Sequence, residues 1–249
     1  MARYAPHTNY FKKSETYSKA YSVTYFFILI FSLIATFFDF HTLQDYLGVV
    51  SIIVLAVLEW ISNDYKTGAE SLRRRDFMDN SFGTNFVHDS SDEYYDNDEV
   101  KTGIKKTMIN LMENIYFSKN ISEEMYRKKL AKNIIAIFII TSVSTYGFFN
   151  NLIAIPMLQI FLSRYFILDL INIYRFKNKL DASFNSLKTV SSNLKRNTQL
   201  NRHEVQFLNT LIEYEVLITD SNIKLDSKIF NQLNAELTNS WNETKKKYI

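Results

Sequence analysis

The 249-residue chain contains no cysteine, only two prolines and only five glycines. Without cysteine it can form no disulfide framework, no thiolate metal site and no cysteine nucleophile. So few glycines leave little room for glycine-rich phosphate loops or for many hairpin turns, which argues against a nucleotide-binding α/β enzyme. The net charge of +3 is too small to indicate nucleic-acid binding. We therefore expect no nucleic-acid partner.

Long apolar runs are what the chain has in abundance. There are four of them, at residues 21–40, 46–63, 133–149 and 152–174. A hydrocarbon core about 30 Å thick requires roughly 20 helical residues, and each run is close to that length. Buried helices of a soluble bundle are the alternative, but such helices usually carry a polar stripe, which the first and third runs lack. The sequence predicts an all-α integral membrane protein with four transmembrane helices in two hairpins.

The basic residues predict the orientation of these helices. All but one of the 29 Lys and Arg residues lie in 1–20, 61–132 or 175–249, and the exception is Arg164 in the fourth run. The short turns at 41–45 and 150–151 contain none. Because Lys and Arg accumulate in cytoplasmic loops, we expect a multi-pass protein of the cell membrane with both termini in the cytoplasm.

Five regions follow from these patterns. They are a cytosolic N-terminal helix (1–20), a first transmembrane hairpin (21–63), a cytosolic helical insert (64–132), a second transmembrane hairpin (133–174) and a cytosolic helical tail (175–249). Within the insert, residues 88–100 hold six acids and no base, and this composition indicates a flexible loop or an acidic contact surface. In the tail, apolar residues recur every three or four positions at Leu180, Phe184, Leu187, Val190 and Leu194. This stripe is suited to packing on another helix or on a second copy.

Polar groups within the apolar runs are the candidate functional residues. Glu59 and Arg164 fall at similar depths, roughly 18 to 20 Å from the outer face, and an intramembrane charge usually needs a partner. We predict an ion pair between them. Asp169 lies nearer the cytoplasmic end, where Arg175 or headgroup water is its expected neighbour. Candidates for lining a pore in an oligomer are Thr141, Ser142, Thr145, Gln159, Ser163 and Asp169. The alternative is that these groups make hydrogen bonds between helices.

Outside the apolar runs, Arg73, Arg74 and Arg75 form a basic cluster that is a candidate contact for lipid headgroups or for an anionic ligand. A solvated juxtamembrane cluster is the alternative. The four histidines are scattered, and no nucleophile–base pair or nucleotide-binding motif is present. We therefore expect no enzyme activity, no cofactor and no metal site.

The layout resembles that of the S-4TM family of pore-forming effectors, which is similar in organisation to the two-span SLATT effectors. Four segments carry the resemblance: TYSKAYS (Thr16–Ser22), GAESLRRRDFMDNSFG (Gly68–Gly83), NLIAIPMLQIFLSRY (Asn151–Tyr165) with its early proline, and RHEVQFLNTLIEYEVL followed by FNQLNAEL near the end. The second segment lacks the Gln-Glu pair of the family, and its Phe77 and Asp79 are not adjacent.

The resemblance implies a membrane effector of bacterial antiphage defence, located in the inner membrane. Such an effector forms a pore or disrupts the membrane as a homo-oligomer when an upstream nucleotide-signalling sensor or a cyclic nucleotide activates it. Two alternatives come from different classes of protein. One is a non-enzymatic membrane scaffold that recruits a soluble partner, and the other is a small ion channel or transporter.

Overall fold

A computed structural model describes residues 5–37, 41–88, 91, 95, 97–145, 167–195, 200–221 and 223–248 of the chain. Over these ranges it contains no β-strand and six α-helices, which are α1 (Thr8–Phe37), α2 (His41–Phe82), α3 (Ile104–Thr145), α5 (Asp169–Lys195), α6 (Leu200–Asp220) and α7 (Ser227–Lys245). The all-α prediction is confirmed. Within the described ranges one helical segment, Tyr46–Phe82, is long and apolar enough to cross a membrane, so four spans remain a prediction.

Three of the helices run through the boundaries that the sequence indicated between cytosolic and membrane regions. α1 joins the N-terminal helix to the first apolar run, α2 joins the second run to the insert, and α3 joins the insert to the third run. The two prolines, Pro6 and Pro156, lie outside these helices. Without an internal proline, each helix keeps its backbone hydrogen bonds across the expected boundary.

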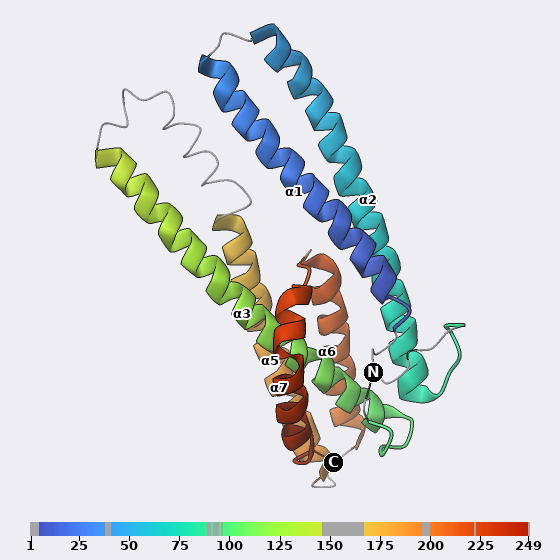
Figure 1. The fold of residues 1–249 in the computed structure, drawn as a ribbon. Coiled ribbons are helices and arrows are strands. Elements are labelled where there is room, and N and C mark those ends of the chain that lie inside the picture. The colour runs from blue at the N-terminus through green and yellow to red at the C-terminus, as the bar shows by residue number, and fades with distance from the viewer. Residues whose placement is uncertain are drawn as a thin grey trace. The chain divides into compact units, whose positions relative to one another are not determined.

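The chain divides into two compact units. The first, which we name the hairpin unit, comprises residues 1–80 and 84–94, and the second, the bundle unit, comprises residues 81–83 and 95–249. In the hairpin unit α1 and α2 run antiparallel, side by side (Figure 1). Ser14 Oγ donates to the Ser62 carbonyl at 2.7 Å, and Ser62 Oγ donates to the Ser14 carbonyl at 2.9 Å. Side chains this small let the two backbones approach closely.

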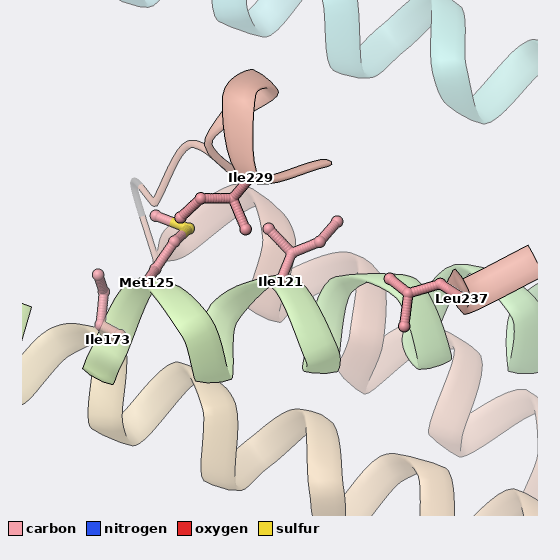
Figure 2. Packing of buried hydrophobic residues seen from close by; sticks show 5 residues of the cluster. All are labelled: Ile121, Met125, Ile173, Ile229 and Leu237. Atoms are coloured by element: carbon pink, nitrogen blue, oxygen red, sulfur yellow. The ribbon is translucent and has the colours of Figure 1, made fainter. Parts of the chain in front are cut away.

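In the bundle unit α3 packs against α5 and α7, and α5 packs against α6 (Figure 1). Figure 2 shows one apolar cluster of this unit, formed by Ile121 and Met125 of α3, Ile173 of α5, and Ile229 and Leu237 of α7. The predicted stripe of the tail lies on α5, where its members Leu180, Phe184, Leu187 and Val190 are buried. Its packing on other helices is therefore confirmed.

Candidate membrane-contact region

Exposed large apolar side chains are concentrated in one part of each long helix. We name these exposed residues the apolar belt: Val23, Phe26, Phe27, Ile30 and Ile34 of α1; Tyr46, Leu47, Val49, Val50, Ile52, Ile53, Val54, Val57 and Trp60 of α2; and Ile134, Ile135, Ile137 and Phe138 of α3. Phe27 of α1 is 69% exposed, Trp60 of α2 is 70% exposed and Phe138 of α3 is 72% exposed. Soluble monomeric proteins rarely expose apolar patches larger than a few hundred Å². Exposure of this kind is unusual for a soluble monomer, and among the described residues the segment Tyr46–Phe82 is the one long and apolar enough to cross a membrane.

On α2 this exposure extends around the helix. Ile52, Ile53 and Val54 are consecutive and all exposed, as are Val49 and Val50 one turn earlier. Successive helical residues point about 100° apart, so three exposed in a row cover more than half of the circumference. The core helix of a soluble protein would have this segment buried, but almost none of it is. This pattern is typical of a helix surrounded by lipid.

Glu59 lies at the C-terminal end of the apolar belt on α2 and is partly buried. Its predicted partner, Arg164, is outside the described residues, and so are Gln159 and Ser163. The Glu59–Arg164 ion pair therefore stays a prediction.

Two of the candidate pore-lining hydroxyls are exposed on α3. Thr141 Oγ1 donates to the Ile137 carbonyl at 2.8 Å, and Ser142 Oγ donates to the Phe138 carbonyl at 2.9 Å. Hydrogen bonds to a carbonyl one turn earlier satisfy a hydroxyl donor without water, as a lipid-facing helix requires. Thr145 is the last residue of α3. These contacts lie within a single helix, so a shared polar pathway remains a prediction.

Asp169 has a different neighbour from the expected one. It begins α5, and its Oδ2 lies 2.5 Å from Lys129 Nζ of α3. A carboxylate in the first turn of a helix also interacts favourably with the helix dipole. Arg175, the expected neighbour, is exposed and makes no ion pair within the described residues. Asp169 thus joins α5 to α3 rather than meeting a cation on its own helix.

This ion pair is one of three that the described side chains form between α3 and α5. The other two are Lys119 Nζ–Asp181 Oδ1 and Lys177 Nζ–Glu123 Oε2, both at 2.6 Å. The hydrogen bond with Lys177 lowers the pKa of Glu123 and raises the pKa of Lys177. Sequence reasoning missed these pairs. The available signal was charge at four-residue spacing, with Lys119 and Glu123 on one helix and Lys177 and Asp181 on the other.

The basic cluster does not form one surface. Arg73 is only 8% exposed, and its Nε donates to Glu70 Oε2 at 2.7 Å. Arg74 is partly buried, and only Arg75 is exposed. Consecutive residues of a helix point in different directions, so the three side chains cannot share one face. Arg73 therefore belongs to the interior of the hairpin unit, and a headgroup or anionic-ligand contact at Arg74 and Arg75 stays a prediction.

Arg73 is part of a buried row of charged residues in the C-terminal half of α2. We name this row the polar stripe, and its members are Lys66, Glu70, Arg73, Asp76 and Asp79. They recur at three- or four-residue spacing, which places them along one side of the helix. His7, which precedes α1, is also buried, and burial together with the charge of Arg73 lowers its pKa to about 4. At neutral pH His7 is therefore uncharged beside the stripe.

Asp79 and Asp76 hold the segment that follows α2. The carboxylate of Asp79 accepts three hydrogen bonds, from Thr84 Oγ1 at 2.8 Å, Phe86 N at 2.7 Å and Val87 N at 2.8 Å. Burial alone would raise the pKa of Asp79, but these donors outweigh it and lower the pKa. Asp76 Oδ1 accepts a hydrogen bond from Ser91 N at 2.8 Å, and burial raises the pKa of Asp76. The two carboxylates fold this segment back onto the end of α2.

The acidic segment at 88–100, for which a flexible loop or an acidic contact surface was expected, is held by hydrogen bonds and ion pairs over its described part. Asn97 is fully buried, and its Nδ2 donates to Asn110 Oδ1 at 2.8 Å and to Glu113 Oε2 at 2.7 Å. The exposed acids also have partners, since Asp98 pairs with Lys106 at 3.1 Å and Glu99 pairs with Lys245 at 2.8 Å. Composition indicated exposure correctly for these two acids but could not show that their neighbours are buried.

Comparison with models of known protein families, with curated proteins and with solved structures gives no match. The described residues include no cluster of His, Asp or Glu that could hold a metal ion. The functional argument therefore starts from the apolar belt, the polar stripe and the ion pairs.

Proposed function

We propose that the chain is a multi-pass membrane protein whose apolar belt inserts into the bilayer and whose polar parts remain in the cytosol. The observation that carries this proposal is the belt of α2, which is exposed around the helix and is followed directly by the buried polar stripe. A helix that changes within a few residues from apolar and exposed to charged and buried has two different surroundings along its length. Lipid around the apolar part of α2, and protein and water around its charged part, account for these two surroundings.

The number and orientation of the spans belong to the same proposal. The belts of α1 and α2 and the exposed apolar end of α3 correspond to three of the four apolar runs. The fourth run is outside the described residues up to position 166. The ion pairs between α3 and α5 show that these two helices run antiparallel. This arrangement supports a return of the chain to the side of the membrane on which α3 started. The distribution of Lys and Arg supports a cytoplasmic location for that side.

We further propose that the protein is a membrane effector, which permeabilises the membrane as a homo-oligomer when an upstream sensor or a nucleotide second messenger activates it. The resemblance to S-4TM effectors supports this role, and so does the organisation of the bundle unit. The other three helices of that unit, α5, α6 and α7, pack around one end of α3, whose other end carries belt residues. A signal received by the bundle could shift the bilayer segment between two packings if it bound one of them better.

A second role, recruitment of a soluble partner, is supported by one feature of α6. Its residues Val205, Leu208, Ile212 and Val216 are all about half exposed or more, and they recur every three or four positions. The opposite side of α6 buries Phe207, Tyr214 and Leu217, so this helix has two apolar sides. An exposed apolar stripe outside the bilayer is typical of a protein-binding surface.

Membrane insertion and orientation can be tested with introduced cysteines, because the natural chain has none. Val54→Cys should resist a water-soluble maleimide in intact membranes, since it lies in the belt. Lys228→Cys, exposed on the bundle unit, should react only after the inner membrane is opened. Recovery of the chain in the soluble fraction after ultracentrifugation without detergent would contradict the proposal. Reaction of Lys228→Cys in sealed cells would contradict the orientation.

The effector role is tested by inducing the chain in bacterial cells and following membrane potential with a voltage-sensitive dye. Overproduction raises the amount of any minor open form along with the total. An effector should depolarise the cells in proportion to its level, whereas a scaffold should leave the potential unchanged. A matched control is Leu180→Ala, which removes a fully buried side chain of the bundle core and should weaken depolarisation at equal membrane yield. An unchanged potential at high yield would favour recruitment by α6.

A further inference from the structure

We propose that exposed cations of the bundle unit bind the phosphate groups of anionic phospholipids where α3 and α5 approach the apolar belt. We name these residues the headgroup collar: Arg127, Lys128, Lys132 and Arg175. The inference rests on the proposed membrane insertion and adds a lipid preference to it. It concerns a different part of the chain from the arginines at 73–75, of which one is buried.

The collar carries positive charge that the protein itself neutralises only weakly. The cations between α3 and α5, Lys119, Lys129 and Lys177, each face a carboxylate on the other helix at 2.5 to 2.6 Å. Lys132 and Arg175 are exposed and form no ion pair in the part of the chain that the structure describes. These two cations are therefore available to an external anion.

The remaining collar residues pair with partly buried glutamates on their own helix. Arg127 Nε lies 3.3 Å from Glu123, and Lys128 Nζ lies 3.7 Å from Glu124. The Arg127 side chain is 67% exposed and that of Lys128 is 49% exposed. Pairs of this type contribute about 0.3 to 0.5 kcal/mol, so a lipid phosphate can compete with them.

Along α3, Lys132 lies at the level of the headgroup layer and Lys128 lies one turn farther from the belt. Lys128, Lys132 and Ile135 follow one another at steps of four and three residues, so they share one side of the helix. Ile135 is 60% exposed and belongs to the belt. At 1.5 Å per residue, Lys132 lies about 5 Å below Ile135, and Lys128 lies about 6 Å lower still. The headgroup layer is roughly 5 to 8 Å thick on each side, and long cationic side chains extend toward it.

Arg175 lies on α5 near the level of Arg127 and Lys128, and its long side chain extends toward the headgroup layer. The rings of Tyr126 on α3 and Tyr174 on α5 are 5.7 Å apart, which sets these two positions side by side. Arg175 therefore lies about 10 Å below Lys132 along the helix axis. Tyr174, its neighbour in sequence, is 49% exposed, and half-exposed tyrosines are typical of the bilayer interface. A guanidinium can also donate two parallel hydrogen bonds to one phosphate.

The test compares lipid binding by the purified full chain in neutral detergent, using native mass spectrometry at low salt. Phosphatidylglycerol and phosphatidylcholine are supplied at equal mole fraction. The collar variant combines Arg127→Gln, Lys128→Gln, Lys132→Gln and Arg175→Gln. The matched control removes four other exposed cations of the same unit, through Lys101→Gln, Lys228→Gln, Lys246→Gln and Lys247→Gln. Both variants change the net charge equally, so a loss confined to the collar variant reports position rather than total charge.

The natural chain should bind phosphatidylglycerol at least tenfold more tightly than phosphatidylcholine, because each cation near an anionic surface contributes about 1 kcal/mol. The collar variant should lose most of this preference and the control should keep it. Equal losses in both variants, or an unchanged preference in the collar variant, would overturn the proposal. Equally tight binding of soluble glycerophosphoglycerol would also overturn it, since the site would then bind a free phosphodiester rather than a lipid.

Failure of the collar and failure of the proposed function give different results. If the chain resists carbonate extraction from membranes but shows no preference between the two lipids, only the collar is refuted. If the natural chain itself appears in the soluble fraction, membrane insertion is refuted together with the collar. The collar variant should still resist extraction, because its belt is intact.

Discussion

The hairpin unit and the bundle unit both carry apolar belt residues, but they stabilise their polar ends differently. The largest fully buried side chains of the described residues all belong to the bundle unit, among them Phe176, Phe207 and Leu180. The hairpin unit buries the charged row of the polar stripe instead. Apolar packing is non-directional and insensitive to pH, whereas buried charges depend on protonation and on hydrogen-bond geometry. We infer that the hairpin unit is the part whose stability responds to its surroundings.

The comparison is tested most strongly by removing apolar volume from the bundle. Leu180→Ala should lower the free energy of unfolding of that unit by about 2 to 5 kcal/mol, because Leu180 is fully buried and its loss leaves a cavity. Thermal or denaturant unfolding in detergent measures the change. Leu208→Ala on α6 is the control, since that side chain is 49% exposed and its truncation should have a much smaller effect. Equal effects would show that the bundle core does not hold this unit together.

The pH response of the hairpin unit is the next largest expected effect. The pKa of His7 falls from 6.5 to about 4 in the folded chain, so between these values the unfolded chain binds more protons. Stability should therefore decrease as the pH falls from about 6.5 to 4, by about 3 kcal/mol in total. Burial raises the pKa of Asp76, and this carboxyl opposes the trend, because stability that depends on its protonated form declines as pH rises.

His7→Gln isolates the contribution of the histidine. Unfolding of the hairpin unit, followed by hydrogen exchange of α1 amides, should lose most of its pH dependence between 4 and 6.5 in this variant. His88→Gln is the control, because His88 is exposed. A pH profile that His7→Gln leaves unchanged would mean that another group of this unit is responsible.

Smaller effects are expected at the carboxylate that holds the segment after α2. Asp79→Ala removes the acceptor of three hydrogen bonds, one of which comes from the buried Val87 amide. It should lower the free energy of unfolding by about 1 to 3 kcal/mol. The amides of Phe86 and Val87 should exchange much faster with solvent. Asp79→Asn keeps one acceptor oxygen and should give an intermediate result, while Asp64→Asn, exposed on the same helix, should change little. Unaltered exchange in Asp79→Ala would show that the segment is held by other contacts.

The smallest effect concerns the charges of the bundle unit. A double-mutant cycle of Lys119→Gln and Asp181→Asn should give a coupling of only about 0.2 to 1 kcal/mol, because both side chains are about one-third exposed. The coupling should decrease at high salt, as screening of exposed charges requires. A coupling well above this range would remove the contrast between the two units, because the bundle would then also depend on its ion pairs.

The sequence was a good guide where periodicity alone decides the structure. The stripe from Leu180 to Val190 is buried as its spacing predicts, and Ile109, Met112 and Ile115 form the buried side of α3 in the same way. α6 and α7 both lie within the region predicted as a helical tail. In these segments one side of the helix consists of apolar residues alone. Their burial can therefore be predicted without knowledge of contacts to distant parts of the chain.

The burial of the polar stripe could not be read from the sequence. Lys66, Glu70 and Arg73 are interspersed with other polar residues, a pattern that is also typical of a solvated helix. Their burial depends on tertiary contacts, such as those that bring His7 and the segment at 84–91 against α2. The same limit applies to Asn97, whose partners Asn110 and Glu113 lie more than ten positions away.

The uninterrupted length of α2 has a mechanical consequence. Its 42 residues extend about 63 Å, roughly twice the thickness of a hydrocarbon core. An α-helix without a proline kink transmits a change of tilt from one end to the other. If α2 crosses the bilayer as proposed, a bilayer that becomes thinner would tilt it. The resulting movement of its C-terminal half would strain the hydrogen bonds that Asp76 and Asp79 make there. Under that proposal, α2 would transmit a change in bilayer thickness to the segment that follows it.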